Sequence, residues 1–211
     1  MTPLYGYSLA GAAMLLLTVV CLTLVNRFIV WHEGRPVNRR LAIPAAMLFI
    51  VLCFLQLPVL FAGHVSPAIQ AVVIYGFSLM FLLLDCSNSW LPLEFTAPFC
   101  IAGVLLTSSP LSAALLNLAM MGGLMTGYRL LLRRMYGADV LGKGDIWMMS
   151  GFAAFFSFTA SAAVLVCGLT ALLLTGRLLR RPALPLAPFV LPFSVLLCVM
   201  YDSLPLTWRL L

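Results

Sequence analysis

Long apolar stretches fill most of this 211-residue chain, and only short segments with charge, proline or glycine separate them. A bilayer-spanning helix needs about 20 apolar residues, and several of the stretches reach that length. Only 9% of the residues are charged and 64% are hydrophobic, whereas a soluble domain has about 25% charged residues. The abundance of Leu, Phe and Met also excludes a disordered chain. We therefore expect an all-α, polytopic membrane protein.

The interruptions divide the chain into about eight transmembrane segments within a single domain, residues 1–211. One stretch, residues 145–176, would be about 48 Å long as a single helix, well beyond a hydrocarbon core of about 30 Å. We therefore expect it to break near residues 157–160 and to give a short sixth helix that begins at Asp145. The predicted segments are 6–26, 42–62, 67–84, 95–107, 110–132, the two within 145–176, and 185–201.

The basic residues indicate how these segments are oriented. Lys and Arg gather in the cytoplasmic loops of membrane proteins. With eight segments, all of the 12 Lys and Arg residues except Arg209 fall on one side, beginning with a basic loop at about residues 27–41. This pattern predicts that the basic loops are cytoplasmic and that both termini are extracytoplasmic.

Two acidic residues stand at the edges of apolar runs. Asp85 follows the run 77–84, and Asp145 precedes the run 146–156. The predicted topology puts both carboxylates at the cytoplasmic ends of their helices. A carboxylate beside a membrane span costs free energy that is usually tolerated only for function. The two residues therefore form either a two-carboxylate site or separate helix caps and polar contacts.

A pair of carboxylates that share a site can hydrolyse a peptide bond. Both cannot ionise cheaply, so the pair holds one proton near neutral pH. The ionised member can activate a water molecule while the protonated member donates its proton to the leaving nitrogen. The six Cys and two His residues show no spacing typical of metal ligands, so we expect no metal.

Asp145 ends the sequence Gly142-Lys143-Gly144-Asp145, whose glycines allow close approaches that other residues do not. This segment resembles the GxGD motif of the type IV prepilin peptidases, a family of membrane-embedded aspartic proteases. Asp85, followed seven positions later by Pro92, is similar to the first catalytic motif of that family. Residues 185–189 resemble the segment that opens the family's last helix, and residues 24–28 resemble a segment at the end of its first helix.

The resemblance implies an aspartic endopeptidase with Asp85 and Asp145 as the catalytic residues, supported by Gly142, Gly144 and Pro92. The substrate would be a prepilin or pseudopilin of a pilus or a secretion system. Cleavage would follow a Gly where the short basic leader meets the bacterial inner membrane. Glu94 and Asp139 could contact that leader, although acids in such loops are more often simply solvated. The other expected partner is membrane lipid, and no nucleic acid is expected.

Long members of the family carry a cytoplasmic domain with paired CxxC motifs and methylate the new N-terminus with S-adenosylmethionine. The basic loop at residues 27–41 stands in place of that domain, so S-adenosylmethionine is expected only if methyltransferase activity is retained. No other cofactor is expected. Trp147, Ala187, Leu93 and Glu94 also depart from the residues usual in the family.

Two other functions fit the same carboxylates. A preflagellin-type peptidase shares both aspartate motifs, although eight segments and the match at residues 185–189 favour the prepilin form. A non-enzymatic transporter could use Asp85 and Asp145 as a proton relay. The relay does not require the glycine turn before Asp145 or the proline after Asp85.

Overall fold

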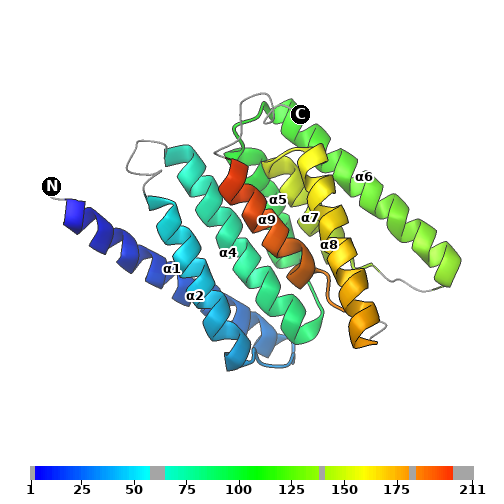
Figure 1. Cartoon of the computed structure of the whole chain (residues 1–211), viewed down its shortest axis with the longest axis horizontal. Helices are drawn as coiled ribbons and strands as arrows, with labels where there is room; N and C mark the ends of the chain where they lie inside the picture. The colour runs from blue at the N-terminus through cyan, green and yellow to red at the C-terminus, as the bar shows by residue number, and fades with distance from the viewer. Residues whose placement is uncertain (1–2, 58–64, 138–140, 181–183, 202–211) are drawn as a thin grey trace. The chain divides into compact units, whose positions relative to one another are not determined.

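The computed structural model describes residues 3–57, 65–137, 141–180 and 184–201 (Figure 1). Within these ranges all regular secondary structure is α-helical, so the all-α prediction is confirmed. The eight helices within the described ranges are α1 (Pro3–Trp31), α2 (Arg39–Leu55), α4 (Val65–Asn88), α5 (Leu93–Leu106), α6 (Leu111–Tyr136), α7 (Lys143–Phe155), α8 (Phe158–Leu179) and α9 (Ala187–Tyr201).

Four stretches of helix in the described ranges are long and apolar enough to cross a membrane. They are Gly11–Trp31, Val65–Asn88, Leu111–Met135 and Phe158–Leu179. The helices Leu93–Leu106 and Ala187–Val199 are also apolar but shorter. This composition is compatible with a polytopic membrane protein, while eight spans and extracytoplasmic termini stay predictions.

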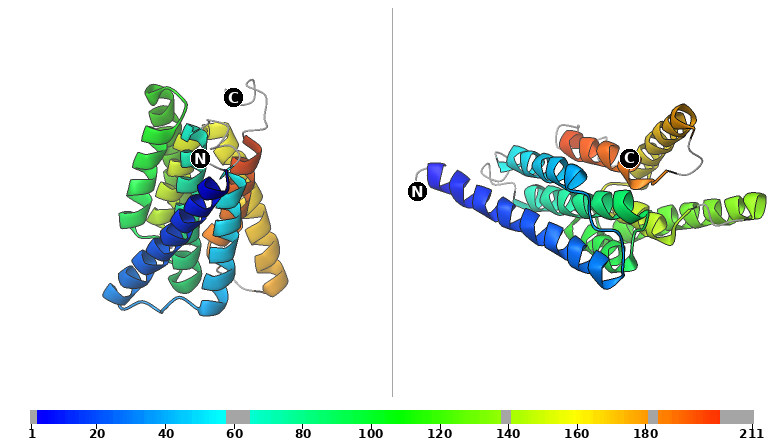
Figure 2. Two further views of the ribbon diagram at one scale, coloured as in Figure 1. Left: turned by 90° about the vertical axis from the view of Figure 1, so that its left-hand side faces the viewer. Right: turned by 90° about the horizontal axis from the view of Figure 1, so that it is seen from below.

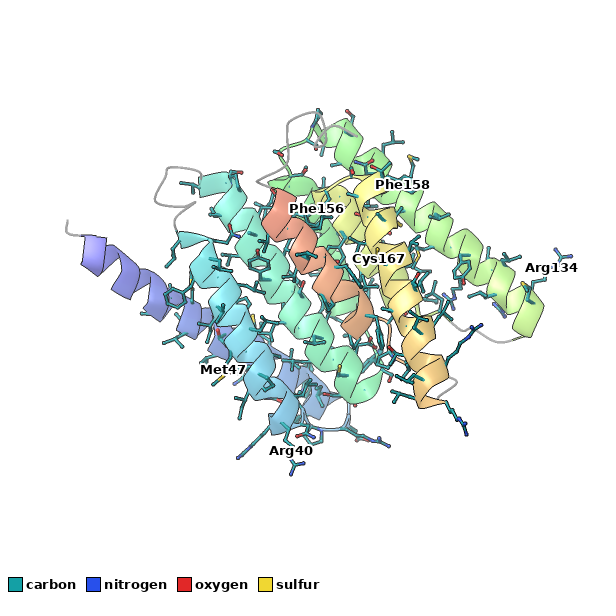
Figure 3. All side chains as sticks on the ribbon, viewed as in Figure 1. Arg40, Met47, Arg134, Phe156, Phe158 and Cys167 are labelled. Atoms are coloured by element: carbon teal, nitrogen blue, oxygen red, sulfur yellow. The ribbon has the colours of Figure 1, made fainter. Side chains whose placement is uncertain are left out.

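The stretch from Asp145 to Gly176 breaks as predicted. Phe156 has φ −102° and ψ −100°, outside the helical region, and Ser157 is extended. The Ser157 hydroxyl accepts a hydrogen bond from the backbone N–H of Ala160 at 3.2 Å, which caps the start of α8. Figure 3 labels Phe156 and Phe158 on the two sides of this break.

Charged residues do not end the helices where the segmentation predicted. α1 continues through Arg27 to Trp31, and α2 begins at Arg39, so their connection is residues 32–38 rather than 27–41. α4 likewise continues past Asp85. A long Arg side chain can run along an apolar helix to reach polar surroundings, so a charge can end an apolar run without ending the helix. Arg40, labelled in Figure 3, is exposed at the start of α2.

Residues 1–88 form one compact unit in which α4 contacts both α1 and α2 (Figure 2). α4 is the most enclosed of the four long apolar helices. Its buried side chains include Ile74, Tyr75 and Phe81. Apolar side chains such as Met47 of α2 are exposed instead, which suits a surface that meets lipid.

Residues 89–211 form a second compact unit centred on α7. α7 contacts α5, α6 and α8, and α9 packs on α8. All residues from Met148 to Phe155 are buried. Phe99 of α5 packs against Phe152 and Phe155 of α7, with ring centroids 4.9 and 5.2 Å apart. These contacts fix α5 beside α7 and so position the start of both helices.

Candidate functional site

Asp145 is the third residue of α7, and its carboxylate closes the first turn of that helix. Gly142 is the N-cap residue, in extended conformation with φ −67° and ψ 149°. Its backbone N–H donates a hydrogen bond of 3.1 Å to Asp145 Oδ2. A carboxylate in the first turn also interacts favourably with the helix dipole. The local sequence therefore holds a half-buried carboxylate at the start of α7.

Gly144 lies directly against the backbone of Leu91, just before α5. A Cβ atom added at Gly144 would overlap the Leu91 carbonyl oxygen and would lie 2.8 Å from its carbonyl carbon. Because the obstacle is backbone, no side-chain rotation can relieve it. Only glycine fits at this position, and the close approach joins two predicted motifs that are far apart in the sequence.

α5 and α7 run parallel from this contact. Near the start, Cys100 Sγ donates to the carbonyl oxygen of Trp147 at 3.1 Å. Further along, a Cβ atom at Gly103 would lie 2.9 Å from the carbonyl oxygen of Gly151. Two successive glycine contacts thus bring the helix backbones close together along their length.

Pro92 ends the segment that contacts Gly144 and serves as the N-cap residue of α5. Its φ of −73° and ψ of 150° are extended, and its carbonyl oxygen accepts a hydrogen bond of 3.3 Å from the hydroxyl of Thr96. Glu94 lies in the first turn of α5 and is exposed. The structure therefore brings Gly142, Gly144, Asp145 and Pro92 together within the second unit.

Asp85 lies in the last turn of α4, within the first unit. Only 5% of the residue is exposed, and the adjacent Leu84 is fully buried. α4 ends at Asn88, and the next residue, Ser89, has a left-handed φ of 50°. A buried carboxylate needs polar surroundings, because burial of an unpaired charge costs free energy.

The remaining predicted residues do not add to these two sites. Asp139 lies outside the described residues. Of the segment 185–189, Leu186 and Ala187 are buried at the start of α9, where α9 packs on α8. Residues 24–28 lie inside α1, where Val25 is buried. Both of these segments therefore have packing roles in the structure.

Asn88 is a polar residue that the sequence reasoning missed. It lies one helical turn after Asp85, and its side chain makes hydrogen bonds with the backbone of Arg35, in the connection between α1 and α2. A polar side chain three positions after a carboxylate lies on the same helix face. This spacing in the sequence could have indicated that Asn88 lies near Asp85. No spacing in the sequence could have indicated Arg35 as its partner.

Asp85 belongs to the first unit and Asp145 to the second. Each carboxylate can donate or accept a proton. Among the described residues, no group of three or more His, Cys, Asp and Glu side chains could hold a metal ion. A comparison with protein-family models finds no match, and comparisons with curated proteins and with solved structures find none either.

Proposed function

We propose that the protein is a membrane-embedded aspartic endopeptidase in which Asp85 and Asp145 are the catalytic residues. Its proposed substrate is a type IV prepilin or pseudopilin, whose short basic leader is removed at the cytoplasmic face of the bacterial inner membrane. The observation that carries this proposal is the contact of Gly144 with Leu91. It gives a tertiary reason for the glycine that directly precedes Asp145.

The two motifs that flank this contact each lead to one carboxylate. Asp145 follows Gly144 directly, and Leu91 stands six positions after Asp85 in the sequence. Each carboxylate also sits at a helix end, which is where a proteolytic site at the membrane surface would need it.

In the proposed reaction the ionised aspartate takes a proton from water, and the resulting hydroxide attacks the carbonyl carbon of the scissile bond. The protonated aspartate then donates its proton to the leaving nitrogen. The C–N bond breaks, and the leader carboxylate and the new amino terminus separate. Water is the only co-reactant of this hydrolysis.

A co-expressed prepilin from the same genome tests the proposal. Wild type should remove the leader, and Asp85→Asn and Asp145→Asn should each abolish cleavage while the protein remains in the membrane. Asn at position 145 keeps a side-chain oxygen that can accept the Gly142 N–H bond, so the start of α7 is preserved. Glu33→Gln is the matched control because Glu33 is an exposed acid with no role in the reaction.

The outcomes separate the candidate functions. Cleavage by both Asn variants would exclude the aspartyl mechanism. A wild type that cleaves no prepilin, but carries protons across vesicles in an Asp85-dependent way, would favour the transporter. Cleavage of a preflagellin but of no prepilin would identify the related peptidase class. A product heavier by one methyl group would show that S-adenosylmethionine is used.

A further inference from the structure

The connection between α1 and α2 turns back toward the end of α4. Two residues after the end of α1, Glu33 is in the left-handed region with φ 53°, and the N–H of Gly34 donates a hydrogen bond of 2.9 Å to the carbonyl oxygen of Ile29. This pattern reverses the chain after a helix. A Cβ atom at Gly34 would lie 3.0 Å from Asn88 Oδ1 and 3.1 Å from the Ile29 side chain. Glycine therefore lets the connection approach Asn88 closely.

The Asn88 carboxamide pairs with both backbone groups of Arg35. Asn88 Oδ1 accepts from the Arg35 N–H at 2.8 Å, and Asn88 Nδ2 donates to the Arg35 carbonyl oxygen at 3.3 Å. The N–H and C=O of one residue face the same partner only where the backbone is extended, as in a hydrogen-bonded pair of antiparallel strands. Asn88 thus binds Arg35 as a neighbouring strand would.

Asn88 is also close to Asp85 within the first unit. The two residues are three positions apart on α4, which puts their Cβ atoms about 5–6 Å apart on the same helix face. A peptidase must hold its substrate beside its catalytic groups, and main-chain pairing is the general way to bind an extended peptide of any sequence. The carboxamide has the required chemistry at the required place.

We propose that Asn88 is a substrate-binding residue for the extended backbone beside the scissile bond, and that Arg35 occupies it in the substrate-free protein. This inference rests on the proposed peptidase function. The substrate residue would replace Arg35 by making the same two hydrogen bonds. Residues 34–36 would then act as a built-in competitor of the substrate.

Replacement of Arg35 by the substrate requires that the hydrogen bonds between Arg35 and Asn88 be easy to break. Both hydrogen bonds are exposed, so water can replace either partner while the connection moves. Arg35 is itself exposed. Only its backbone N–H and carbonyl oxygen bind Asn88, so no buried side chain has to be released when the contact breaks. The contact is therefore suited to displacement by a ligand that offers the same backbone groups.

Four variants test the proposal through the KM for prepilin cleavage. Asn88→Ala removes the binding group and should raise KM about tenfold, as expected for two modest hydrogen bonds. Arg35→Pro removes the N–H that competes for Asn88 and should lower KM by about threefold. Arg35→Ala keeps that N–H and is the control for the lost charge. Val37→Pro is the control for an added proline in the same connection.

The direction in which Arg35→Pro changes KM shows whether Asn88 binds substrate or only supports the fold. If Asn88 only holds the connection in place, Arg35→Pro and Asn88→Ala break the same contact and should change KM in the same direction. That result would overturn the proposal. Opposite directions, with Val37→Pro close to wild type and with Arg35→Ala not reproducing the effect of Arg35→Pro, would support it.

A binding measurement separates this inference from the proposed function. Hydrogen exchange is followed in residues 34–38 of the Asp145→Asn variant, with and without the prepilin. Faster exchange on addition of prepilin would support displacement of Arg35, and unchanged exchange would overturn it. Because this variant is not required to cleave, the outcome stands apart from the cleavage test, whose failure would refute the peptidase function itself.

Discussion

Gly144→Ala is the substitution that most directly tests the packing at the start of α7. The added methyl group would overlap the Leu91 carbonyl oxygen and would lie 2.8 Å from the carbonyl carbon. Both atoms are backbone, so α5 and α7 must separate at this end to make room. The contacts of Phe99 with Phe152 and Phe155 oppose that separation.

The magnitude follows from the balance of two effects. Adding a methyl group to a well-packed contact lowers the free energy of unfolding by about 1–3 kcal/mol. Because the obstacle at Gly144 is rigid backbone, we expect a cost at the upper end of that range. Replacing glycine by alanine within a helix raises the free energy of unfolding by up to about 1 kcal/mol, because alanine favours the helix. We expect Gly144→Ala to lower the free energy of unfolding by about 2–3 kcal/mol, which corresponds to a fall in Tm of about 4–12 °C for a chain of this size.

Tryptophan fluorescence during heating of the purified protein in detergent measures this change. Trp90 immediately precedes Leu91, and Trp147 follows Gly144 by three residues, so both lie near the junction. We expect the low-temperature spectrum to change as well, because separation of the helices alters the surroundings of these side chains. Under the proposed function, prepilin cleavage should also fall, since Asp145 adjoins the displaced residue.

Two matched glycine variants supply the comparison. At Gly142 the added methyl group would meet only the Asp145 carboxylate, whose Oδ2 is 3.0 Å away, and we expect a loss of about 1 kcal/mol or less. At Gly123, in α6, the added methyl group would meet none of the described atoms within 4 Å, and we expect the free energy of unfolding to rise by up to about 1 kcal/mol. If Gly144→Ala matched either control in Tm, the close contact with Leu91 would be wrong.

Three further substitutions have clear expected signs, and thermal unfolding measures each. Glu33→Gly should raise stability by about 1 kcal/mol, because glycine adopts the left-handed φ of 53° without steric cost; a lower Tm would show that this conformation carries no strain. Ser157→Ala removes the hydroxyl that caps α8 through Ala160 and should cost about 1 kcal/mol, whereas an unchanged Tm would mean that the cap is not needed. Ser161→Ala removes a buried hydroxyl that has no hydrogen-bond partner among the described residues, and the change should stabilise the protein by about 1 kcal/mol. A lower Tm would show that the hydroxyl does make a stabilising hydrogen bond.

Local signals in the sequence determined the helices themselves. Apolar runs predicted where most helices lie, and length alone predicted the break that Ser157 marks. The apolar run after Asp145 predicted a short helix beginning at that residue, and α7 begins two residues earlier, at Lys143. Such features depend on neighbouring residues, whose hydropathy, capping and backbone preferences can be read directly from the chain.

The sequence placed helix ends less well where charge was used as the marker. Arg27 and Asp85 lie inside α1 and α4 because a helix continues as long as its backbone hydrogen bonds and its packing favour it. A charged side chain changes the surface that a helix presents more readily than it ends the helix. The connection between α1 and α2 is consequently shorter than the predicted basic loop.

Only the tertiary structure decided which residues meet. The need for glycine at position 144 comes from Leu91, and the role of Asn88 comes from Arg35, although both partners are far away along the chain. Such contacts depend on how whole helices pack, and many pairings of apolar helices satisfy the same hydropathy pattern. The sequence therefore determined the helices and marked the two carboxylates, whereas close packing of backbones decided what surrounds them.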